Sequence, residues 1–404
     1  FFKQKTAYEI PLRLVGSELC MRDRNRDMNI TFLIGNGFDL NLGLATAYSD
    51  FVKYYKETDA EKNVLIKFRQ DISDNEAHWS AAEIEMGRYT GTFKTGQGEA
   101  FSECHTDFCK HLATYLKQQQ DRIDYDYIAK QIEQAFANIN TLAKLFPEQE
   151  RSVIQSIYSR YESERTTFNF INFNYTDTLD KCIALIKSNQ SVLGSHRSGS
   201  TIYNHRIGEV QHVHGTLESQ MVFGVNDESQ IAKPDIFECD FGDIYEASFI
   251  KKQANENYRE NTDSKAYNLL KSSQLIYVYG MSIGETDSLW WERICEWLAA
   301  NSYHHLIIYK HSMPHFRLLG TEHLICERKT RNEIMDYSAY TKDQLKSLGP
   351  RIHVTGENPF GKLNGVADKT KSPVEIFLDA ANEAASSLNN GNKELLEAYQ
   401  TATK

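Results

Sequence analysis

The sequence predicts an α/β fold, a Rossmann-like parallel sheet with a large helical insertion layer, and three observations lead to this prediction. Short apolar runs such as 30–34 and 275–279 have the length of buried strands. Several of these runs end directly in glycine or in polar side chains. The stretch between the first run and the next, about 52–165, is polar and helix-rich, and it has almost no glycine or proline clusters that would mark hairpins.

The first element is the segment 30–39, in which an apolar run leads straight into two glycines and a helix-like segment. Glycine at positions 35 and 37 lets the backbone turn tightly and approach a ligand, and the free amides of a following helix favour a phosphate. The third glycine of the full dinucleotide fingerprint is missing, because Phe38 and Asp39 follow directly. A ligand loop and a purely structural turn therefore both remain open for this segment alone.

Three later apolar runs end in polar or glycine residues. The runs and the residues after them are 168–173 with Asn174 to Asp177, 210–213 with His214 and Gly215, and 275–279 with Gly280 to Ser282 and then Asp287. In open α/β sheets the ligand crevice lies outside the carboxyl ends of the strands. We therefore expect these groups to converge with the first glycine loop.

The order and content of these motifs resemble the AbiH family of phage abortive-infection proteins and, more distantly, the sirtuin-like domains that bind and cleave NAD. The resemblance runs from about residue 28 to about residue 310. Its segments are GNGFD (35–39), LATAYSDF (44–51), WSAAE (79–83), FNYT (173–176), HG (214–215) and GMSIGETD (280–287). Two features depart from the sirtuin pattern: Asp177 stands one place later than the usual acidic residue, and Asn36 and Phe38 replace smaller residues in the first loop.

The resemblance implies NAD as the substrate and assigns roles to the motif residues. Cleavage of the bond between nicotinamide and ribose passes through an electron-poor sugar, so the site must mainly orient the ribose and a water. Asn174 would hold the ribose hydroxyls or the water, and His214 would accept a proton. These two are the catalytic candidates. The expected NAD-binding residues are Gly35, Asn36, Gly37, Phe38, Asp39, Gly280, Ser282 and Asp287.

Within that set the expected roles differ. The amides of residues 35–37 would take the pyrophosphate, and Asp39 or Ser282 would hold ribose or adenosine hydroxyls. Asp287 is expected to cap the tryptophan-rich helix that follows it rather than to act on the substrate. His212 is expected to pack on the same side of its strand as His214, but deeper. Whether the substrate is NAD or NADP stays open.

Two functions follow from this reading. The first is an enzyme of antiphage defence that hydrolyses NAD to nicotinamide and ADP-ribose when infection is sensed, restrained until then. The alternative is a non-catalytic sensor that binds NAD, ADP-ribose or a related nucleotide and switches a partner. A nuclease ranks last, because the sequence has neither a metal-binding acidic cluster nor a basic stripe. A homo-oligomer and a phage-derived or protein trigger are the expected partners.

Composition limits the remaining classes. The formal net charge of -10 argues against a general affinity for nucleic acid. No run of about eighteen apolar residues predicts a membrane helix. The cysteines, seven in number, are scattered, which fits reduced thiols in the cytoplasm. They also lack the two closely spaced pairs of the zinc module in deacylating sirtuins, so no metal is expected.

The insertion contains one long segment with the periodicity of an amphipathic helix. Apolar residues recur at intervals of three and four, up to a stop before Pro147: Ile128, Ile132, Phe136, Ile139 and Leu142. By the family resemblance, such a layer would cover the nucleotide crevice. Trp79 and Glu83 lie one helical turn apart and could point into the crevice; the alternative is a core tryptophan beside a solvated glutamate.

The remaining segments complete the organisation. Residues 1–27 are similar to translated read-through of sequencing adapters, and we expect a non-native extension before Met28. The α/β domain covers 28–310 and includes further predicted strands at 221–225 and 306–309. The C-terminal extension, 311–404, should contain a charged helix at about 328–347, an edge strand at 351–354 and a tail.

Overall fold

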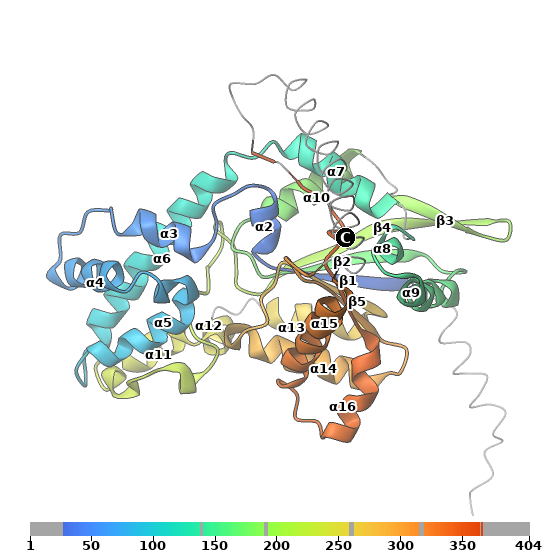
Figure 1. Ribbon diagram of the computed structural model, residues 1–404. Coiled ribbons are helices and arrows are strands. Elements are labelled where there is room, and N and C mark those ends of the chain that lie inside the picture. Colours follow the sequence, from blue (N-terminus) through green and yellow to red (C-terminus); the bar gives the residue numbers. More distant parts are fainter. Residues whose placement is uncertain are drawn as a thin grey trace, which may run out of the picture.

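The sheet predicted from the sequence is present in the computed structural model, which describes residues 27–137, 140–189, 193–257, 262–314, 319–363 and 365–366. Over these ranges the chain forms a seven-stranded sheet with the order β3-β4-β2-β1-β5-β6-β7 (Figure 1). Neighbouring strands are parallel except for the antiparallel pair β3 and β4. The α/β fold with a mainly parallel sheet is thus confirmed. The expected extension before Met28, apart from Asp27, and the C-terminal tail lie outside the described residues.

The central strands are buried on both faces. The strands are β1 (Met28–Ile34), β2 (Thr166–Asn172), β3 (Gly194–Ser198), β4 (Thr201–His212), β5 (Leu275–Tyr279), β6 (His305–Tyr309) and β7 (Ile352–Thr355). Along β1, Phe32 points into one hydrophobic core and Leu33 into another, because successive side chains of a strand face opposite ways. This two-sided burial explains why the strand sequences are almost wholly apolar.

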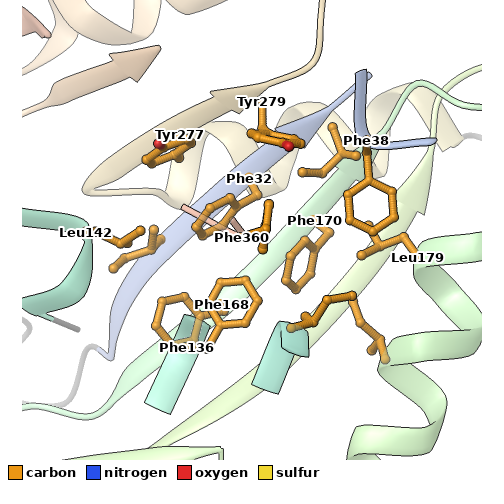
Figure 2. Close-up of a cluster of buried hydrophobic side chains, with 14 of the residues drawn as sticks. Phe32, Phe38, Phe136, Leu142, Phe168, Phe170, Leu179, Tyr277, Tyr279 and Phe360 are labelled. Atoms are coloured by element: carbon orange, nitrogen blue, oxygen red, sulfur yellow. The ribbon is translucent and has the colours of Figure 1, made fainter. Parts of the chain in front are cut away.

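One face of the sheet is covered by α7 (Tyr125–Ala137), α8 (Asn140–Lys144), α9 (Glu148–Arg160) and α10 (Thr178–Asn189). Aromatic rings dominate this core (Figure 2). The ring of Phe32 stacks on Tyr277 at 5.1 Å and on Phe170 at 5.6 Å, and meets Phe136 edge-on at 5.2 Å. The apolar residues predicted to share a helix face before Pro147 lie in α7 and α8, except Ile139, which is outside the described residues.

The opposite face is covered by α13 (Thr262–Ser272), α14 (Ser288–Ala300), α15 (Gly320–Met335) and α16 (Lys342–Leu348). The single charged helix predicted at about 328–347 is therefore wrong, because α15 ends at Met335 and α16 begins at Lys342 behind a capping box formed by Thr341 and Gln344. The predicted edge strand is confirmed as β7, parallel to β6.

A third hydrophobic core lies outside the sheet and defines what we call the helical lobe. It is formed by α3 (Tyr48–Tyr55), α4 (Asn63–Asp74), α5 (Ala82–Tyr89), α6 (Gly98–Gln120) and α11 (Gly242–Phe249). The next helix, α12 (Lys251–Asn257), packs against α11 and is counted with the lobe. These helices gather on the left of Figure 1, on the side away from the β3–β4 hairpin. The predicted insertion thus divides in two: its first part builds the lobe, while α7 to α9 cover the sheet.

The short helical elements are α2 (Gly37–Asn41) and the 3-10 turns η1 (His78–Ala81), η2 (Thr90–Thr92), η3 (Glu228–Gln230), η4 (Pro234–Phe237), η5 (Glu285–Asp287) and η6 (Gly349–Arg351). No helix in the described ranges combines the length and the apolar character needed to cross a membrane.

The predicted strand at 221–225 is wrong. Phe223 and Val225 are buried in the core of the helical lobe, and Val225 makes only an isolated bridge to Ile250. Burial in a helical core gives the same apolar run as burial in a sheet, so periodicity could not separate the two cases. The run at 210–213 is confirmed as the end of β4, but the rest of β4 and its hairpin with β3, both rich in polar residues, were not predicted.

Candidate functional site

A cavity of about 1480 Å³ lies at the carboxyl ends of the parallel strands. The residues that follow β1, β2, β4, β5 and β6 contribute to its wall. Nine of the ten residues expected at the site line it: Gly35, Asn36, Gly37, Asp39, Asn174, His214, Gly280, Ser282 and Asp287. Phe38 does not. Its side chain is fully buried against Tyr279 and Phe360 in the aromatic core (Figure 2).

Gly35, Gly37 and Gly280 pack backbone against backbone, and we call this contact the glycine floor. A Cβ atom at Gly37 would lie 2.4 Å from the Cα of Gly280, and one at Gly35 would lie 2.6 Å from the carbonyl oxygen of Gly280. Gly280 itself has a φ of 69°, a conformation that favours glycine. The glycines of the first loop are therefore required by the packing of two turns against each other.

The amides of the glycine floor are already hydrogen-bonded. The Gly35 amide donates to the carbonyl of Tyr279 at 2.9 Å, and the Gly37 amide donates to the carbonyl of Gly280 at 2.8 Å. The expectation that these two amides are free for a pyrophosphate is therefore wrong for this structure. The helix that follows, α2, spans only five residues and so adds little dipole.

Asp39 ties the first loop to the loop after β2. Its two carboxylate oxygens accept hydrogen bonds from the hydroxyls of Thr176 at 2.5 Å and Thr178 at 2.6 Å. Burial raises the pKa of Asp39 to about 6, against the lowering effect of these two hydrogen bonds. The use of Asp39 for a ribose hydroxyl stays a prediction.

Asn174 lies in the loop after β2 and also links it to the first loop. Its side-chain amide donates to the carbonyl of Gly35 at 3.3 Å, and its backbone amide donates to the side chain of Asn172 at 3.0 Å. The residue is almost fully buried and lines the cavity. This placement fixes the side chain at the carboxyl end of β2, beside the glycine floor.

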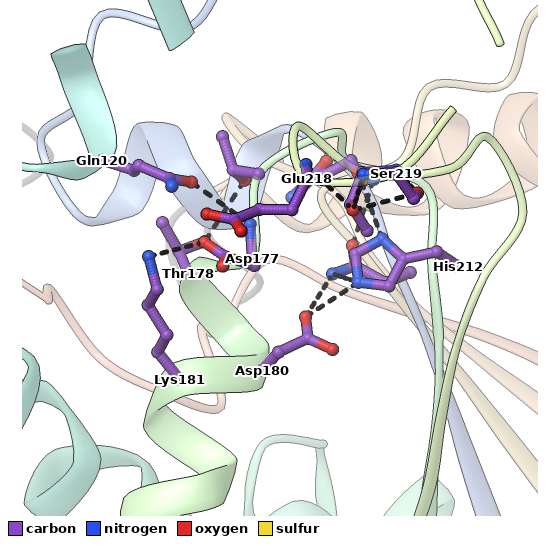
Figure 3. A network of polar contacts seen from close by, with 12 residues as sticks. Gln120, Asp177, Thr178, Asp180, Lys181, His212, Glu218 and Ser219 are labelled. Carbon is purple, nitrogen blue, oxygen red and sulfur yellow. Dashed lines mark hydrogen bonds and ion pairs between the residues drawn. The ribbon is translucent and has the colours of Figure 1, made fainter. Parts of the chain in front are cut away.

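His212 belongs to a polar network beneath this loop (Figure 3). Its Nε2 lies 2.8 Å from a carboxylate oxygen of Asp180, and its Nδ1 lies 3.0 Å from the carbonyl of Asn174. Burial would lower the pKa of His212, but Asp180 raises it on balance. The expectation of a simple packing residue is wrong, because the ring bonds to acceptors at both nitrogens and supports the backbone of Asn174.

Four ionisable side chains follow one another at the other end of the cavity, and we call them the buried ion chain: His214, Asp287, Lys251 and Glu83. Nε2 of His214 lies 3.1 Å from Oδ1 of Asp287, which lies 3.6 Å from Nζ of Lys251. Nζ in turn lies 2.8 Å from Oε2 of Glu83. The four side chains are at most 15% exposed.

Asp287 is held as a carboxylate in this chain. Burial alone would raise its pKa, but the Lys251 ammonium and the hydrogen bond from His214 lower it to about 2. Burial likewise opposes the charge on Lys251, yet Glu83 and Asp287 raise its pKa. The expected capping role of Asp287 is wrong. It stands at the start of α14, but its side chain makes no cap because it faces His214 and Lys251.

His214 has one ring nitrogen that makes no hydrogen bond within the described residues. Since Nε2–H donates to the Asp287 carboxylate, the lone pair of the neutral ring lies on Nδ1. Nδ1 is buried and has no hydrogen-bond partner among the residues that the structure describes. Buried polar atoms are normally satisfied, so this nitrogen is a fitting acceptor for a bound hydroxyl or water.

Two tyrosines form hydrogen bonds with Glu83, the last member of the buried ion chain. The hydroxyls of Tyr48 and Tyr175 lie 3.2 Å and 3.1 Å from Oε1 of Glu83, and both tyrosines line the cavity. Glu83 therefore points into the crevice, as one reading of the sequence expected, while Trp79 packs in the core of the lobe. Tyr48 and Tyr175 lie within motifs that the sequence offered, but nothing in the sequence around Lys251 marked it as part of a site.

No group of three or more histidine, cysteine or acidic side chains is placed to hold a metal ion within the described ranges. The cavity thus offers an amide, an imidazole paired with a carboxylate, a buried ammonium and hydroxyls. This set can bind a polar ligand, orient a sugar and accept a proton.

Comparison with known proteins adds one match. A family model described as "Bacteriophage abortive infection AbiH" matches residues 31–309, from β1 to the end of β6. The match covers more than half of the chain and includes every candidate site residue. A search of curated proteins found no match.

Proposed function

The chain belongs to the AbiH family of bacteriophage abortive infection proteins, and we propose that it acts in this defence by hydrolysing NAD to nicotinamide and ADP-ribose. The observation that carries the proposal is the meeting of Asn174, His214 and the glycine floor in one cavity at the carboxyl ends of parallel strands. Nucleotides bind at this place in open α/β sheets.

The dimensions of the cavity support a dinucleotide. Small-molecule pockets usually measure about 300–1,000 Å³, and this cavity is larger, about 1480 Å³. Its wall runs from Lys310, after β6, past Gly280 and Asn174 to His214. An extended ligand can therefore contact several strand ends at once, with its reactive part near the ion chain.

The reaction requires little from the protein beyond orientation and one proton acceptor. The bond between the ribose and the nicotinamide nitrogen breaks, and its electron pair leaves with nicotinamide. Water forms the new bond to the same ribose carbon, and its proton passes to Nδ1 of His214 and then to solvent. Asp287 orients the ring and stabilises the imidazolium that forms, in the way a carboxylate supports a catalytic histidine. Asn174 would hold the ribose or the water.

The test is a time course of the full chain with NAD, in which chromatography follows nicotinamide and ADP-ribose. We expect His214→Ala to lower kcat/KM by at least roughly 100-fold, or about 3 kcal/mol of transition-state stabilisation, and Asn174→Ala to lower it as well. His196→Ala is the matched control, because His196 lies on β3 and does not line the cavity. Turnover retained in His214→Ala would refute the histidine assignment.

A second candidate is a sensor that binds NAD or ADP-ribose without turnover and switches a partner. The altered first loop favours it, since Asn36 and Phe38 stand where the sirtuin pattern has smaller residues. Calorimetric binding of NAD or ADP-ribose without release of nicotinamide, abolished by Gly37→Trp, would support the sensor over the enzyme. For the enzyme, a trigger and self-association are part of the proposal, because NAD loss must be restrained in a healthy cell.

A further inference from the structure

We propose that Lys251 is a positioning residue that couples the helical lobe to the His214–Asp287 pair, so that the pair is held for catalysis only while Glu83 of the lobe holds Lys251. This inference rests on the proposed function for its activity readout. It concerns regulation of the same site, and it arises from the order of the groups in the buried ion chain.

The ammonium of Lys251 stands between two parts of the fold. Its side chain leaves the start of α12 and donates to Oε2 of Glu83, on α5, at 2.8 Å. On the other side it donates to the carbonyl of Thr286 at 3.1 Å and lies 3.6 Å from Oδ1 of Asp287. The closest contact is therefore to the lobe, and the contact to Asp287 is an ion pair without a short hydrogen bond.

Asp287 depends on this ammonium for its charge. Burial favours the protonated acid, and Lys251 is the strongest of the groups that favour the carboxylate. A protonated Asp287 would be a weaker acceptor for Nε2–H of His214, and the ring would lose the partner that fixes its orientation. Removing Lys251 should therefore disturb His214 although the two residues do not touch through a hydrogen bond.

Glu83 and Lys251 both belong to the lobe, and the hydrogen bond between them fixes the position of the ammonium. One carboxylate oxygen of Glu83 accepts hydrogen bonds from the hydroxyls of Tyr48 and Tyr175, and the other accepts one from the ammonium of Lys251. Tyr48 begins α3 of the lobe, whereas Tyr175 follows β2 of the sheet and packs into the core of the lobe. Because both residues move with the lobe, a displacement of the lobe would carry the ammonium away from Asp287 and leave that buried carboxylate without its cation.

The test uses Lys251→Met, Glu83→Gln and the double variant. Lys251→Met should lower kcat for NAD by at least about tenfold with little change in KM. It should also lower the melting temperature, because it leaves Glu83 buried without its counter-ion. The double variant removes that unpaired carboxylate, so it should regain thermal stability but not kcat. Lys251→Arg should restore part of kcat, because it keeps the charge.

The matched control is Arg69→Met. Arg69 forms another buried ion pair of the lobe, with Asp107 at 2.9 Å, and neither residue lines the cavity. This variant should lower the melting temperature while the kcat of the folded protein stays unchanged. Recovery of kcat together with stability in the double variant, or an unchanged kcat in folded Lys251→Met, would overturn the proposal.

A separate readout distinguishes failure of this inference from failure of the proposed function. If the wild-type chain does not cleave NAD, the proposed function fails, and the coupling is read from the proton–nitrogen NMR signal of His214 Nε2–H instead. Loss or a large shift of this signal in Lys251→Met, but not in Arg69→Met, supports the coupling without any turnover. A His214 Nε2–H signal that is identical in the wild type and in Lys251→Met would overturn the proposed coupling.

Discussion

The two walls of the cavity are built in different ways. The sheet-side wall, residues 35–37, 39, 174–176 and 280–284, consists of strand ends that are held by close backbone contacts and by hydrogen bonds between loops. The lobe-side wall, Tyr48, Glu83 and Lys251, consists of long polar side chains that reach the cavity from helices. The sheet-side wall therefore depends on the exact course of the backbone, whereas the lobe-side wall depends on the balance of buried charge.

This difference predicts different responses to mutation. Added volume should damage the sheet-side wall, where a Cβ has no room at the glycine floor. Loss of a charge or a hydrogen bond should damage the lobe-side wall, because an uncompensated buried ion is costly. Asp39 is the exception on the sheet side, since it is a buried carboxylate without a cationic hydrogen-bond partner.

The largest expected effect is the pH dependence that Asp39 imposes on stability. Its pKa is about 6 in the folded protein, above the ordinary value of 3.8. As pH rises from about 4 to about 6, the unfolded chain releases this proton first, so the free energy of unfolding falls. The loss from this group is about 3 kcal/mol by pH 7. In Asp39→Asn the loss should be absent, as measured by urea unfolding at pH 4 and pH 7.

Groups that titrate elsewhere affect both proteins equally. The informative quantity is therefore the stability of Asp39→Asn minus that of the wild type, which should grow by about 2 kcal/mol from pH 4 to pH 7, because the unfolded carboxyl is already partly ionised at pH 4. A difference that stays constant over this range would contradict the buried, raised-pKa carboxylate.

The next effect is the intolerance of the glycine floor to a methyl group. Gly37→Ala should lower the free energy of unfolding by about 1–3 kcal/mol, because its Cβ would lie 2.4 Å from the Cα of Gly280. Gly284→Ala is the matched control on the same wall, since its nearest contact would be 3.8 Å away, at Ser282. We expect it to be neutral or to stabilise by about 0.4–1 kcal/mol. Equal unfolding curves for the two variants would argue against the close packing.

A smaller effect is expected for Tyr48→Phe on the lobe-side wall. It removes one hydrogen bond to Glu83, which keeps those from Tyr175 and Lys251, so the free energy of unfolding should fall by about 1 kcal/mol. Tyr54→Phe in the same helix is the control, because its hydroxyl has no hydrogen bond to any residue in the described ranges. Chemical unfolding at neutral pH measures both, and an equal change in the two would contradict the role of Tyr48.

The smallest effect concerns the outer surface of the lobe. Lys62 pairs with Glu103 at 2.5 Å, but the lysine side chain is 62% exposed. Solvent screens such a pair, so Lys62→Met should leave the unfolding transition unchanged within error. A destabilisation as large as that of Lys251→Met would show that burial is not what separates the two lysines.

The sequence allowed the sheet-side wall to be predicted in some detail. Gly35, Asn174, His214 and Gly280 each follow an apolar run, and the carboxyl ends of parallel strands meet at one edge, so their convergence could be inferred from the expected parallel sheet alone. Local patterns also indicated the insertion, although they did not show that it splits between the lobe and the sheet.

The lobe-side wall could not be predicted because its partners are far apart in the chain. Lys251 meets Glu83 and Asp287 only through the packing of three separate elements, and a lysine in a charged segment looks like any solvated lysine. The same reason applies to the amides of Gly35 and Gly37. Their hydrogen bonds go to Tyr279 and Gly280, which no local pattern connects with the first loop.

The glycine floor also bears on how the protein is made. It joins residues 35–37 with residue 280, and Asp287 follows shortly after, so the floor and the His214–Asp287 pair require nearly the whole α/β domain. Synthesis delivers the amino end of a chain first. A nascent chain, or one that terminates early, therefore has no assembled cavity until β5 and the turn after it have left the ribosome. The proposed activity would therefore arise only after residue 287 has been translated.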